Sequence, residues 1–435
     1  MNGSDRWRTW GHTKECRPAT IEICSSVLEL AEELERARAA GQTVKVVGSG
    51  HSFTDIACTD GRLIEVAGLD RVLDVDPDAC TATVEAGISI KQLNLELGLR
   101  GLALPNMGDI DRQTLAGAVS TGTHGTGATF GGLATFIRGM ELLTADGETL
   151  WCSPDEEPEV FACARVGLGA LGIVTKVALE CVPAFNLHHV ERKRRLPDVL
   201  AELDAMVDAN EHFEFYWLPH TETCATITNN RTAEPARPKS AYKTWRAEVF
   251  YPNFVFGAFV AAGRAFPAKV PRLAEIMAST VGAAELIGRS DAVFVSTRIL
   301  RFAEMEYSIP REHATAAVLA VSELIDEGDH RVSFPIEVRF VAADDIPLSM
   351  ASGRDSCFVA VHMAAGADYE PYFRGVEAIM DGFGGRPHWG KLHFQTAETL
   401  APRYPELDRF LAVRDRLDPD RRFTNAYLDR VLGPA

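Results

Sequence analysis

The chain has 435 residues, of which 46% are hydrophobic and 24% are charged, and its formal net charge is −17. This length allows two or three domains with cores of their own, and the composition excludes a disordered or fibrous protein. The negative charge argues against nucleic acid as a partner, because the phosphate backbone is bound by basic surfaces. The short basic run at residues 192–195 is predicted to be a solvated loop, with an anion site as the alternative.

The cysteines and the apolar segments bear on where the protein resides. There are nine cysteines without a C-x-x-C pair, a pattern typical of a reducing compartment. The first ten residues are polar, unlike a signal peptide. The longest apolar stretch, residues 254–262, is far shorter than the ~20 residues that span a bilayer. We expect a cytoplasmic protein without a transmembrane segment, in which residues 254–262 are either buried or in peripheral contact with a membrane.

The first 180 residues combine many short strands with few helices. Ser26 and Glu29 form a capping-box signature, which predicts a helix that ends at Gly41. A second short helix is predicted at residues 90–97. Alternating or β-branched runs bounded by turn residues predict strands at 43–47, 63–66, 72–75, 81–85, 140–144, 148–151 and 173–179. The turn at Asp146-Gly147 predicts that two of these strands form a hairpin.

A change in composition at Val182-Pro183 predicts a domain boundary. The second half contains a Pro-, Arg- and Asn-rich segment at 229–243, predicted to be a loop. It is followed by predicted strands at 334–341 and 357–361 and by a helical region that ends near Leu432. We therefore predict an α+β protein with one domain at residues 1–182 and a second at 183–435.

Two glycine-rich segments, residues 48–53 and 117–127, indicate a phosphate-containing ligand. Their backbone N–H groups and hydroxyls are potential phosphate donors, and glycine allows close approach of a ligand. A tight surface loop is the alternative for residues 117–127. The first segment is not a Rossmann fingerprint, because Phe53 stands where the third glycine is required. The sequence also lacks a Walker A motif, H-E-x-x-H and G-x-S-x-G.

Five segments in this order carry a resemblance to a known family. Residues 47–53, 117–127 and 169–174 resemble the FAD-binding domain of the vanillyl-alcohol oxidase superfamily. Residues 335–339 and 385–391 resemble the aldonolactone oxidase family, which includes L-gulono-1,4-lactone and D-arabinono-1,4-lactone oxidases and alditol oxidases, with the bacterial L-gulono-1,4-lactone dehydrogenases as the nearest branch. The resemblance covers roughly residues 18–432. It implies a two-domain α+β fold in which the C-terminal segment of the substrate domain returns to the flavin.

The resemblance also implies which residues hold FAD. In that family the histidine of Gly-His-Ser is commonly bonded to the flavin 8α-methyl, which implies covalent attachment at His51, with non-covalent binding as the alternative. His124 is either a flavin contact or a structural histidine, and Thr114 is expected on the substrate side of the flavin. The other implied contacts are Val47, Gly48, Ser49, Gly50, Ser52, Gly117, Ser120, Thr121, Thr123, Gly125, Gly172, Ile173, Val174 and His388.

Glu337 and Arg339 are the strongest candidates for the chemistry. The period of two in a strand places both on one face, where the guanidinium helps the carboxylate to stay ionised. From the residues alone, a solvent-facing ion pair is the alternative. The resemblance implies that this pair binds and activates substrate, and that Lys391 lies near the flavin, where a cation favours the anionic reduced form. His362 is a weaker candidate for the pocket wall.

Together these features predict an FAD-dependent oxidoreductase. It is expected to oxidise the C2 hydroxyl of an aldono-1,4-lactone by hydride transfer to flavin N5, with oxygen or a cytochrome-like protein as the final electron acceptor. Whether Glu337, His362 or the flavin takes the hydroxyl proton stays open. The alternatives are an alditol oxidase and a sugar- or nucleotide-binding protein without turnover. No metal is expected.

Overall fold

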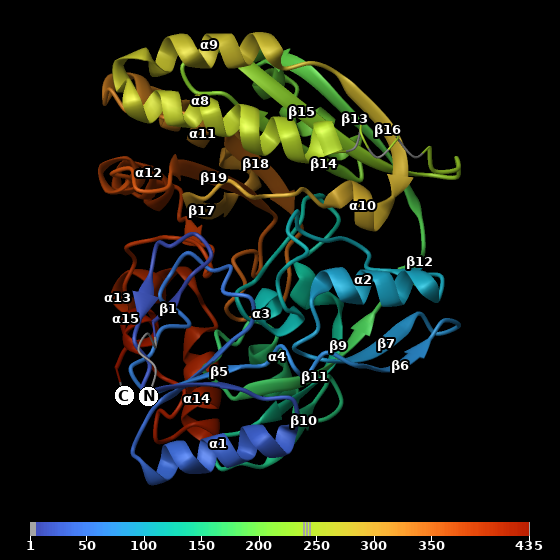
Figure 1. Cartoon of the computed structure of the whole chain (residues 1–435), viewed down its shortest axis with the longest axis vertical. Coiled ribbons are helices and arrows are strands. Elements are labelled where there is room, and N and C mark those ends of the chain that lie inside the picture. The colour runs from blue at the N-terminus through green and yellow to red at the C-terminus, as the bar shows by residue number, and fades with distance from the viewer. Residues whose placement is uncertain (1–5, 238–239, 241, 243–244, 435) are drawn as a thin grey trace.

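The computed structural model describes residues 6–237, 240, 242 and 245–434. Most of the first half of the chain forms the lower part of Figure 1, and most of the second half forms the upper part. Each part contains its own sheet system with helices packed on it, so the predicted α+β class is confirmed. Among the described residues, no helix has the length and apolar character needed to cross a bilayer.

A small parallel sheet with one helix begins the fold. Its strands lie in the order β3 (Thr20–Ile23), β5 (Arg62–Glu65), β4 (Val44–Val47), and α1 (Val27–Ala39) connects β3 to β4. Ser26 caps α1 by accepting a hydrogen bond from the Glu29 backbone N–H. The predicted capping box is only half formed, because the Glu29 carboxylate accepts from the backbone N–H of Ser25. Gly41, at φ +64°, follows the helix end.

The rest of the first half is built on a five-stranded antiparallel sheet. The β9–β10 hairpin forms across Asp146-Gly147 as predicted, with Leu143 paired to Thr149. The strands in order are β10 (Thr149–Cys152), β9 (Ile137–Leu143), β11 (Ile173–Glu180), β7 (Thr81–Glu85) and β6 (Val72–Asp76). The helices of this part are α2 (Ile90–Leu99), α3 (Leu115–Ser120) and α4 (Pro158–Ala164).

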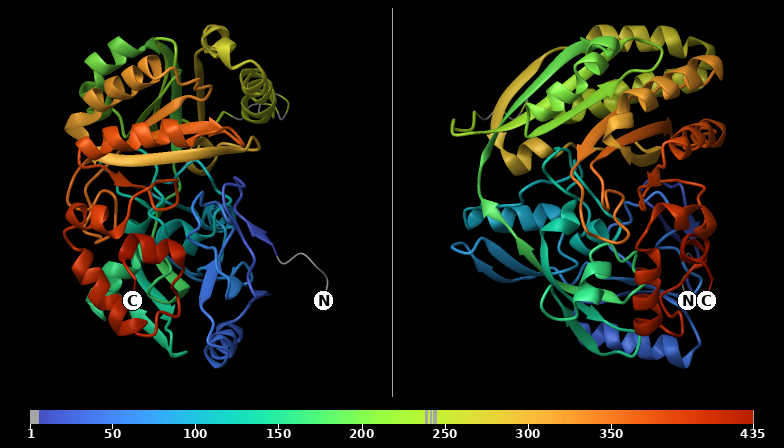
Figure 2. Two further views of the ribbon diagram at one scale, coloured as in Figure 1. Left: turned by 90° about the vertical axis from the view of Figure 1, so that its left-hand side faces the viewer. Right: turned by 180° about the vertical axis from the view of Figure 1, so that it is seen from behind.

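An eight-stranded antiparallel sheet dominates the second half. The strands in order are β16 (Ala284–Arg289), β13 (Asn186–Arg195), β15 (Thr223–Thr232), β14 (His212–Trp217), β18 (Ile336–Val341), β19 (Ser356–Ala364), β17 (Phe302–Pro310) and β20 (Arg386–Pro387). Figure 2 shows α5, α6 and α11 on one side of this sheet and α8 and α9 on the other. The helices are α5 (Leu196–Ala201), α6 (Leu203–Asp208), α8 (Phe256–Ala265), α9 (Val270–Thr280), α10 (Ser290–Phe294), α11 (Ala314–Glu327) and α12 (Glu370–Gly382).

The two faces of β18 have different surroundings, and this difference positions the site. Ile336, Val338 and Phe340 pack into the core shared with α5, α6, α11 and α12. Val341, on the opposite face, belongs to the core of the first half of the chain. The strand is therefore buried on both faces. Its second face, which carries Glu337 and Arg339, turns toward the first half of the molecule.

Two loop predictions are wrong. Residues 192–195 belong to β13, and residues 229–232 belong to β15, because these two strands pair over ten consecutive positions. Their polar side chains suggested loops. In an antiparallel sheet with one face in solvent, however, a strand keeps its backbone hydrogen bonds while the side chains on that face remain hydrated. Parts of the remaining predicted loop, residues 238–239, 241 and 243, lie outside the described residues.

The apolar stretch at 254–262 is neither a strand nor wholly buried. It spans the end of the π-helical segment η2 (Arg246–Val255) and most of α8. Phe259 and Val260 are buried, whereas Phe254 is 56% exposed. The stretch is therefore apolar on both sides, and one side lies in the core while the other is exposed to solvent.

The C-terminal residues contact both parts of the molecule. β20 pairs with β17 in the large sheet, and Phe53 donates a backbone hydrogen bond to Gly390 at 2.7 Å. Farther on, α14 (Leu407–Leu417) and α15 (Ala426–Leu432) join the core of the first half, after the short helix α13 (Ala397–Leu400). The division at residue 182 stays a prediction.

Candidate active site

A first cavity, with about 970 Å³ of empty space partly open to solvent, lies among the glycine-rich segments. Segments from β4, α3 and the start of β11 converge on it. The predicted cofactor contacts that line it are Val47, Gly48, Ser49, Gly50, His51, Ser52, Thr114, Gly117, Ser120, Thr121, Gly172, Ile173 and Val174.

Four predicted cofactor contacts lie elsewhere. Thr123, His124 and His388 line a second cavity, and Gly125 lies outside the lining of both. A Cβ at Gly125 would come within 2.3 Å of the Met107 carbonyl oxygen, so glycine is needed there for packing of the chain. Thr114 lines the first cavity but not the second, and its hydroxyl caps α3.

The first cavity has the backbone geometry that a dinucleotide requires. A Cβ at Gly48 would lie 1.9 Å from the Thr114 hydroxyl, so no side chain fits where the loop passes α3. Gly50 adopts φ +66°, a conformation that glycine reaches without strain. The loop between them can therefore offer backbone N–H groups to a ligand at close range. These residues fit an FAD pyrophosphate.

The two cavities meet at His51, which lines both of them together with Ser52, Gln113 and Thr121. The His51 ring stacks on Trp10, with 5.5 Å between ring centroids. Burial, reinforced by Lys391, lowers the pKa of His51 to about 4. The imidazole is therefore neutral at physiological pH, as a nucleophile must be.

The second cavity, with about 1120 Å³ of empty space, brings the four predicted catalytic residues together. Glu337 and Arg339 are 4% and 6% exposed, which excludes a solvent-facing pair. Arg339 Nε lies 3.3 Å from Glu337 Oε1, and Lys391 and His362 line the same space. Tyr216, which sequence reasoning missed, donates a hydrogen bond to Glu337 Oε1 at 2.7 Å.

Glu304 and Glu306 of β17 were also missed, although they are central to the charge network. Lys391 Nζ lies 2.5 Å from Glu304 Oε2, and Arg339 Nη2 lies 2.9 Å from Glu306 Oε1. Both acids are buried. Residues 303–309 alternate apolar and polar side chains in the same way as 336–340, so this pattern could have identified them.

A loop near the cavity contributes a further ion pair without a recognisable sequence signal. Arg298 Nη2 lies 3.0 Å from Asp109 Oδ2, and both side chains line the second cavity. The Asn253 amide donates to the Thr297 carbonyl at 2.9 Å, and its oxygen accepts from Ile299 N at 2.6 Å. η2 thereby holds the loop that presents Arg298.

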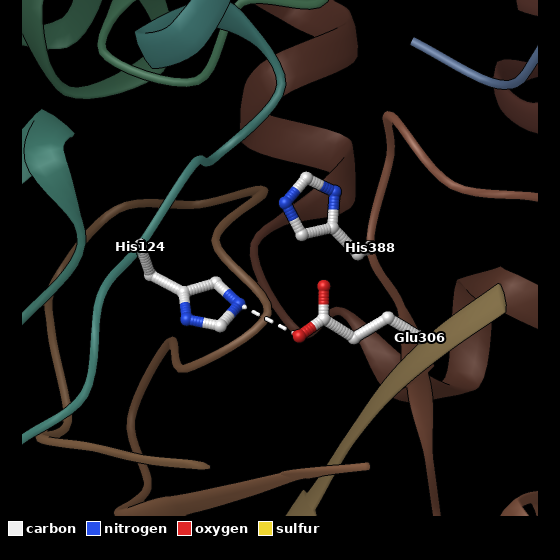
Figure 3. A group of neighbouring side chains, drawn as sticks. All are labelled: His124, Glu306 and His388. Atoms are coloured by element: carbon white, nitrogen blue, oxygen red, sulfur yellow. Dashed lines mark ion pairs between the residues drawn. The ribbon is translucent and has the colours of Figure 1, made fainter. Parts of the chain in front are cut away.

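Two groups of side chains in the second cavity have the residue types of a metal site: Glu304, Glu337 and His362, and the group drawn in Figure 3, which is His124, Glu306 and His388. His388 Nδ1 accepts a hydrogen bond from Gly390 N at 3.0 Å. In a neutral ring the proton then sits on Nε2, so this nitrogen has no lone pair for a metal. The carboxylates already pair with Arg339 or Lys391. The donor set favours an ion-pair network over metal binding.

Comparisons with known proteins agree with this arrangement. Residues 18–153 match the model of an FAD binding domain, and residues 177–431 match that of D-arabinono-1,4-lactone oxidase. L-gulono-1,4-lactone dehydrogenase of Mycobacterium tuberculosis is 46% identical, with 98% of this chain and 99% of the relative covered. Alditol oxidase of a Streptomyces species is 34% identical, with 96% and 95% covered.

A solved structure supports the fold. Cholesterol oxidase from B. sterolicum superposes with a TM-score of 0.83 over 99% of this chain and 97% of that one, at 17% identity. At this identity the likeness concerns the fold alone. Taken with the full-length relatives and the two cavities that meet at His51, it shows that the chain belongs to the D-arabinono-1,4-lactone oxidase family of FAD-dependent oxidoreductases.

Proposed function

We propose that the protein oxidises the C2 hydroxyl of an aldono-1,4-lactone, with L-gulono- and D-arabinono-1,4-lactone as the first candidates. One observation carries the proposal: the cavity that contains Glu337, Arg339 and Lys391 adjoins the flavin-type cavity at His51. A polyhydroxylated ring suits a cavity dense in hydrogen-bonding groups of both signs. The names of the relatives, which include L-gulonolactone oxidases and D-arabinono-1,4-lactone oxidases, support this substrate class.

The side chains of the second cavity bind and orient the substrate. FAD, held by the glycine-rich segments, supplies the hydride acceptor N5 when bound. Arg339 and Lys391 donate hydrogen bonds to substrate oxygens, and Glu337 accepts one from a substrate hydroxyl. The protein thereby orients the C2–H bond and excludes water from it.

His362 is the proposed acceptor of the hydroxyl proton. Its Nδ1 lies 3.1 Å from the Pro335 carbonyl oxygen, which can only accept, so Nδ1 carries the ring proton. Nε2 therefore faces the second cavity with its lone pair, 3.5 Å from Glu304 Oε1, and this carboxylate already has Lys391 as its cation. This carboxylate would stabilise the imidazolium that forms when Nε2 takes the proton.

A substrate panel tests the proposed activity. L-gulono-1,4-lactone, D-arabinono-1,4-lactone and xylitol are supplied with and without oxygen, with an artificial dye acceptor in parallel. At least one lactone should reduce the flavin without oxygen and sustain turnover with the dye, whereas turnover that requires oxygen identifies an oxidase. Activity on xylitol alone would replace the proposal by its alternative, an alditol oxidase. A colourless protein without flavin absorbance would contradict both.

We also propose that FAD is attached covalently at His51. Acid-precipitated wild-type protein should stay yellow, because the bond survives unfolding, and His51→Ala should release the colour into the supernatant. His362→Asn serves as the matched control, since it removes another cavity imidazole and should leave the pellet yellow. A colourless wild-type pellet would retire covalent attachment without affecting FAD binding itself.

The electron acceptor and the location complete the proposal. The acceptor is oxygen or a cytochrome-like protein. The substrate panel distinguishes these two, because only an oxidase requires oxygen for turnover. We propose that the protein resides in the cytoplasm. The aromatic side chains of η2 and its surroundings, with Tyr251 50% exposed and Phe254 56% exposed, provide a surface for peripheral membrane contact.

A further inference from the structure

His124 and Glu306 form an unusual contact at the inner wall of the second cavity (Figure 3). His124 is 3% exposed and Glu306 is 1% exposed. His124 Nδ1 lies 2.9 Å from the Gly125 carbonyl oxygen. Because a carbonyl oxygen can only accept, Nδ1 must carry a proton. Nε2, buried and without a hydrogen-bond partner, then lies 3.4 Å from Glu306 Oε1.

A neutral His124 would make this contact unfavourable. Its Nε2 lone pair would face a carboxylate oxygen in a site from which water is excluded, and the two electron-rich atoms would repel each other. A proton on Nε2 converts the contact into an imidazolium–carboxylate pair. The ring also lies 3.8 Å, centroid to centroid, from Phe358 of β19, an arrangement that stabilises a cation.

The proton does not belong to the carboxylate. Arg339 Nη2 lies 2.9 Å from Glu306 Oε1. Although burial favours the neutral acid, Arg339 holds the pKa of Glu306 well below its usual range. Glu306 is therefore ionised, and the additional proton resides on the ring.

The charges of the second cavity point to the same result. Among the described residues that line it, four carboxylates, Asp109, Glu304, Glu306 and Glu337, face three permanent cations, Arg298, Arg339 and Lys391. Arg339 forms ion pairs with two of the carboxylates, so one negative charge has no cation of its own. Burial lowers the pKa of His388 to about 3, so that ring is not the missing cation. Glu304 has Lys391, so the missing charge concerns Glu306 and Glu337, which share Arg339. The His362 ring lies against Glu304, whereas the His124 ring lies against Glu306.

We infer that His124 is a buried imidazolium held by Glu306, and that it acts as a positioning charge in the wall of the second cavity. His124 balances part of the negative charge of Glu306, so the Arg339 guanidinium is available to Glu337 and to substrate. Its positive charge also offsets the negative charge that the cofactor gains on reduction. The protonation state follows from this chain's contacts alone, whereas the effect on reduction rests on the proposed function.

Nitrogen-15 NMR of histidine side chains in the holoprotein tests the protonation state. The His124 ring is assigned through its nuclear Overhauser contacts with Phe358. Both ring nitrogens should be protonated at neutral pH, and Glu306→Gln should convert the ring to the neutral Nδ1–H form. Glu304→Gln, on the same strand but paired with Lys391, should leave the imidazolium signal in place. A neutral His124 ring in the wild type would overturn the inference, as would a stoichiometric divalent metal that His124→Asn removes.

The midpoint potential of the bound flavin tests the positioning role. His124→Asn should lower the potential, because an uncompensated Glu306 disfavours the reduced cofactor. Adding Glu306→Gln should return the potential toward the wild-type value, which a purely structural role would not do. Unchanged potentials in both variants would reject the charge-balancing role. Failure of lactones to reduce the flavin would instead contradict the proposed function and leave the NMR result intact.

Discussion

Glu337→Gln is expected to lower kcat for lactone oxidation by about 10²–10³-fold, the range for loss of one preorganised polar contact to the reacting group. Gln keeps the size of the side chain but loses the charge that pairs with Arg339 and the strong acceptor for Tyr216. The variant should keep its flavin, because Glu337 does not line the first cavity. Steady-state rates and the flavin absorbance of the same preparation check both statements.

Glu214→Gln is the matched control. Glu214 lies directly opposite Arg339 in the β14–β18 ladder, so its position in the sheet is comparable. Burial, together with the Glu337 charge, raises the pKa of Glu214 to about 8. It is therefore largely neutral at pH 7, and an amide replaces it at little cost. Near-normal kcat in the Glu337 variant would show that the strand pair is structural.

Lys391→Met is expected to reduce both stability and the rate of flavin reduction. It leaves Glu304 buried without its cation, and removal of one partner from a buried pair costs about 3–5 kcal/mol in the free energy of unfolding. The rate should fall because a cation near the reacting atoms is lost. Denaturant unfolding and anaerobic stopped-flow measure the two effects.

The double variant Lys391→Met, Glu304→Gln separates these effects. It removes the unpaired charge, so stability should recover while reduction stays slow. Although burial opposes it, Lys391 lowers the pKa of Glu304 to about 2 from 4.5. A depressed folded-state pKa stabilises the protein above the unfolded value, so the pair's contribution is present above pH 4.5 and lost as the pH falls toward 2. Recovery of the reduction rate in the double variant would mean that Lys391 acts only on stability.

Local patterns were sufficient for much of the first cavity. The positive φ of Gly50 is a requirement of its own turn, whereas the collision that excludes a side chain at Gly48 involves Thr114 in a distant segment. The alternation around Glu337 likewise predicted that it shares a face with Arg339. Such predictions succeed because a turn or a strand face depends on neighbours a few residues away.

Long-range pairing accounts for what local patterns missed. Glu306 reaches Arg339 only because β17 pairs with β19, which pairs with β18. Glu304 reaches Lys391 because β20, just before this lysine, pairs with β17. The same holds for residues 192–195, whose polar run looked like a loop until the ten-residue pairing with β15 made it a strand. The resemblance implied a cofactor contact for His388 and left His124 as either a flavin contact or a structural histidine, and both line the second cavity.

Glycine placement and residue alternation along the chain were thus enough to predict a phosphate-binding loop, a Glu–Arg pair on one strand face and the α+β class, whereas the flavin was implied by the family resemblance. The meeting of two cavities at His51, the burial of the ion pairs and the contact between His124 and Glu306 depend on strand order and on the return of the C-terminal residues. The reason is physical: backbone geometry sets the direction of each side chain locally, whereas the dielectric surroundings and partners of a charge are set by every segment that packs around it.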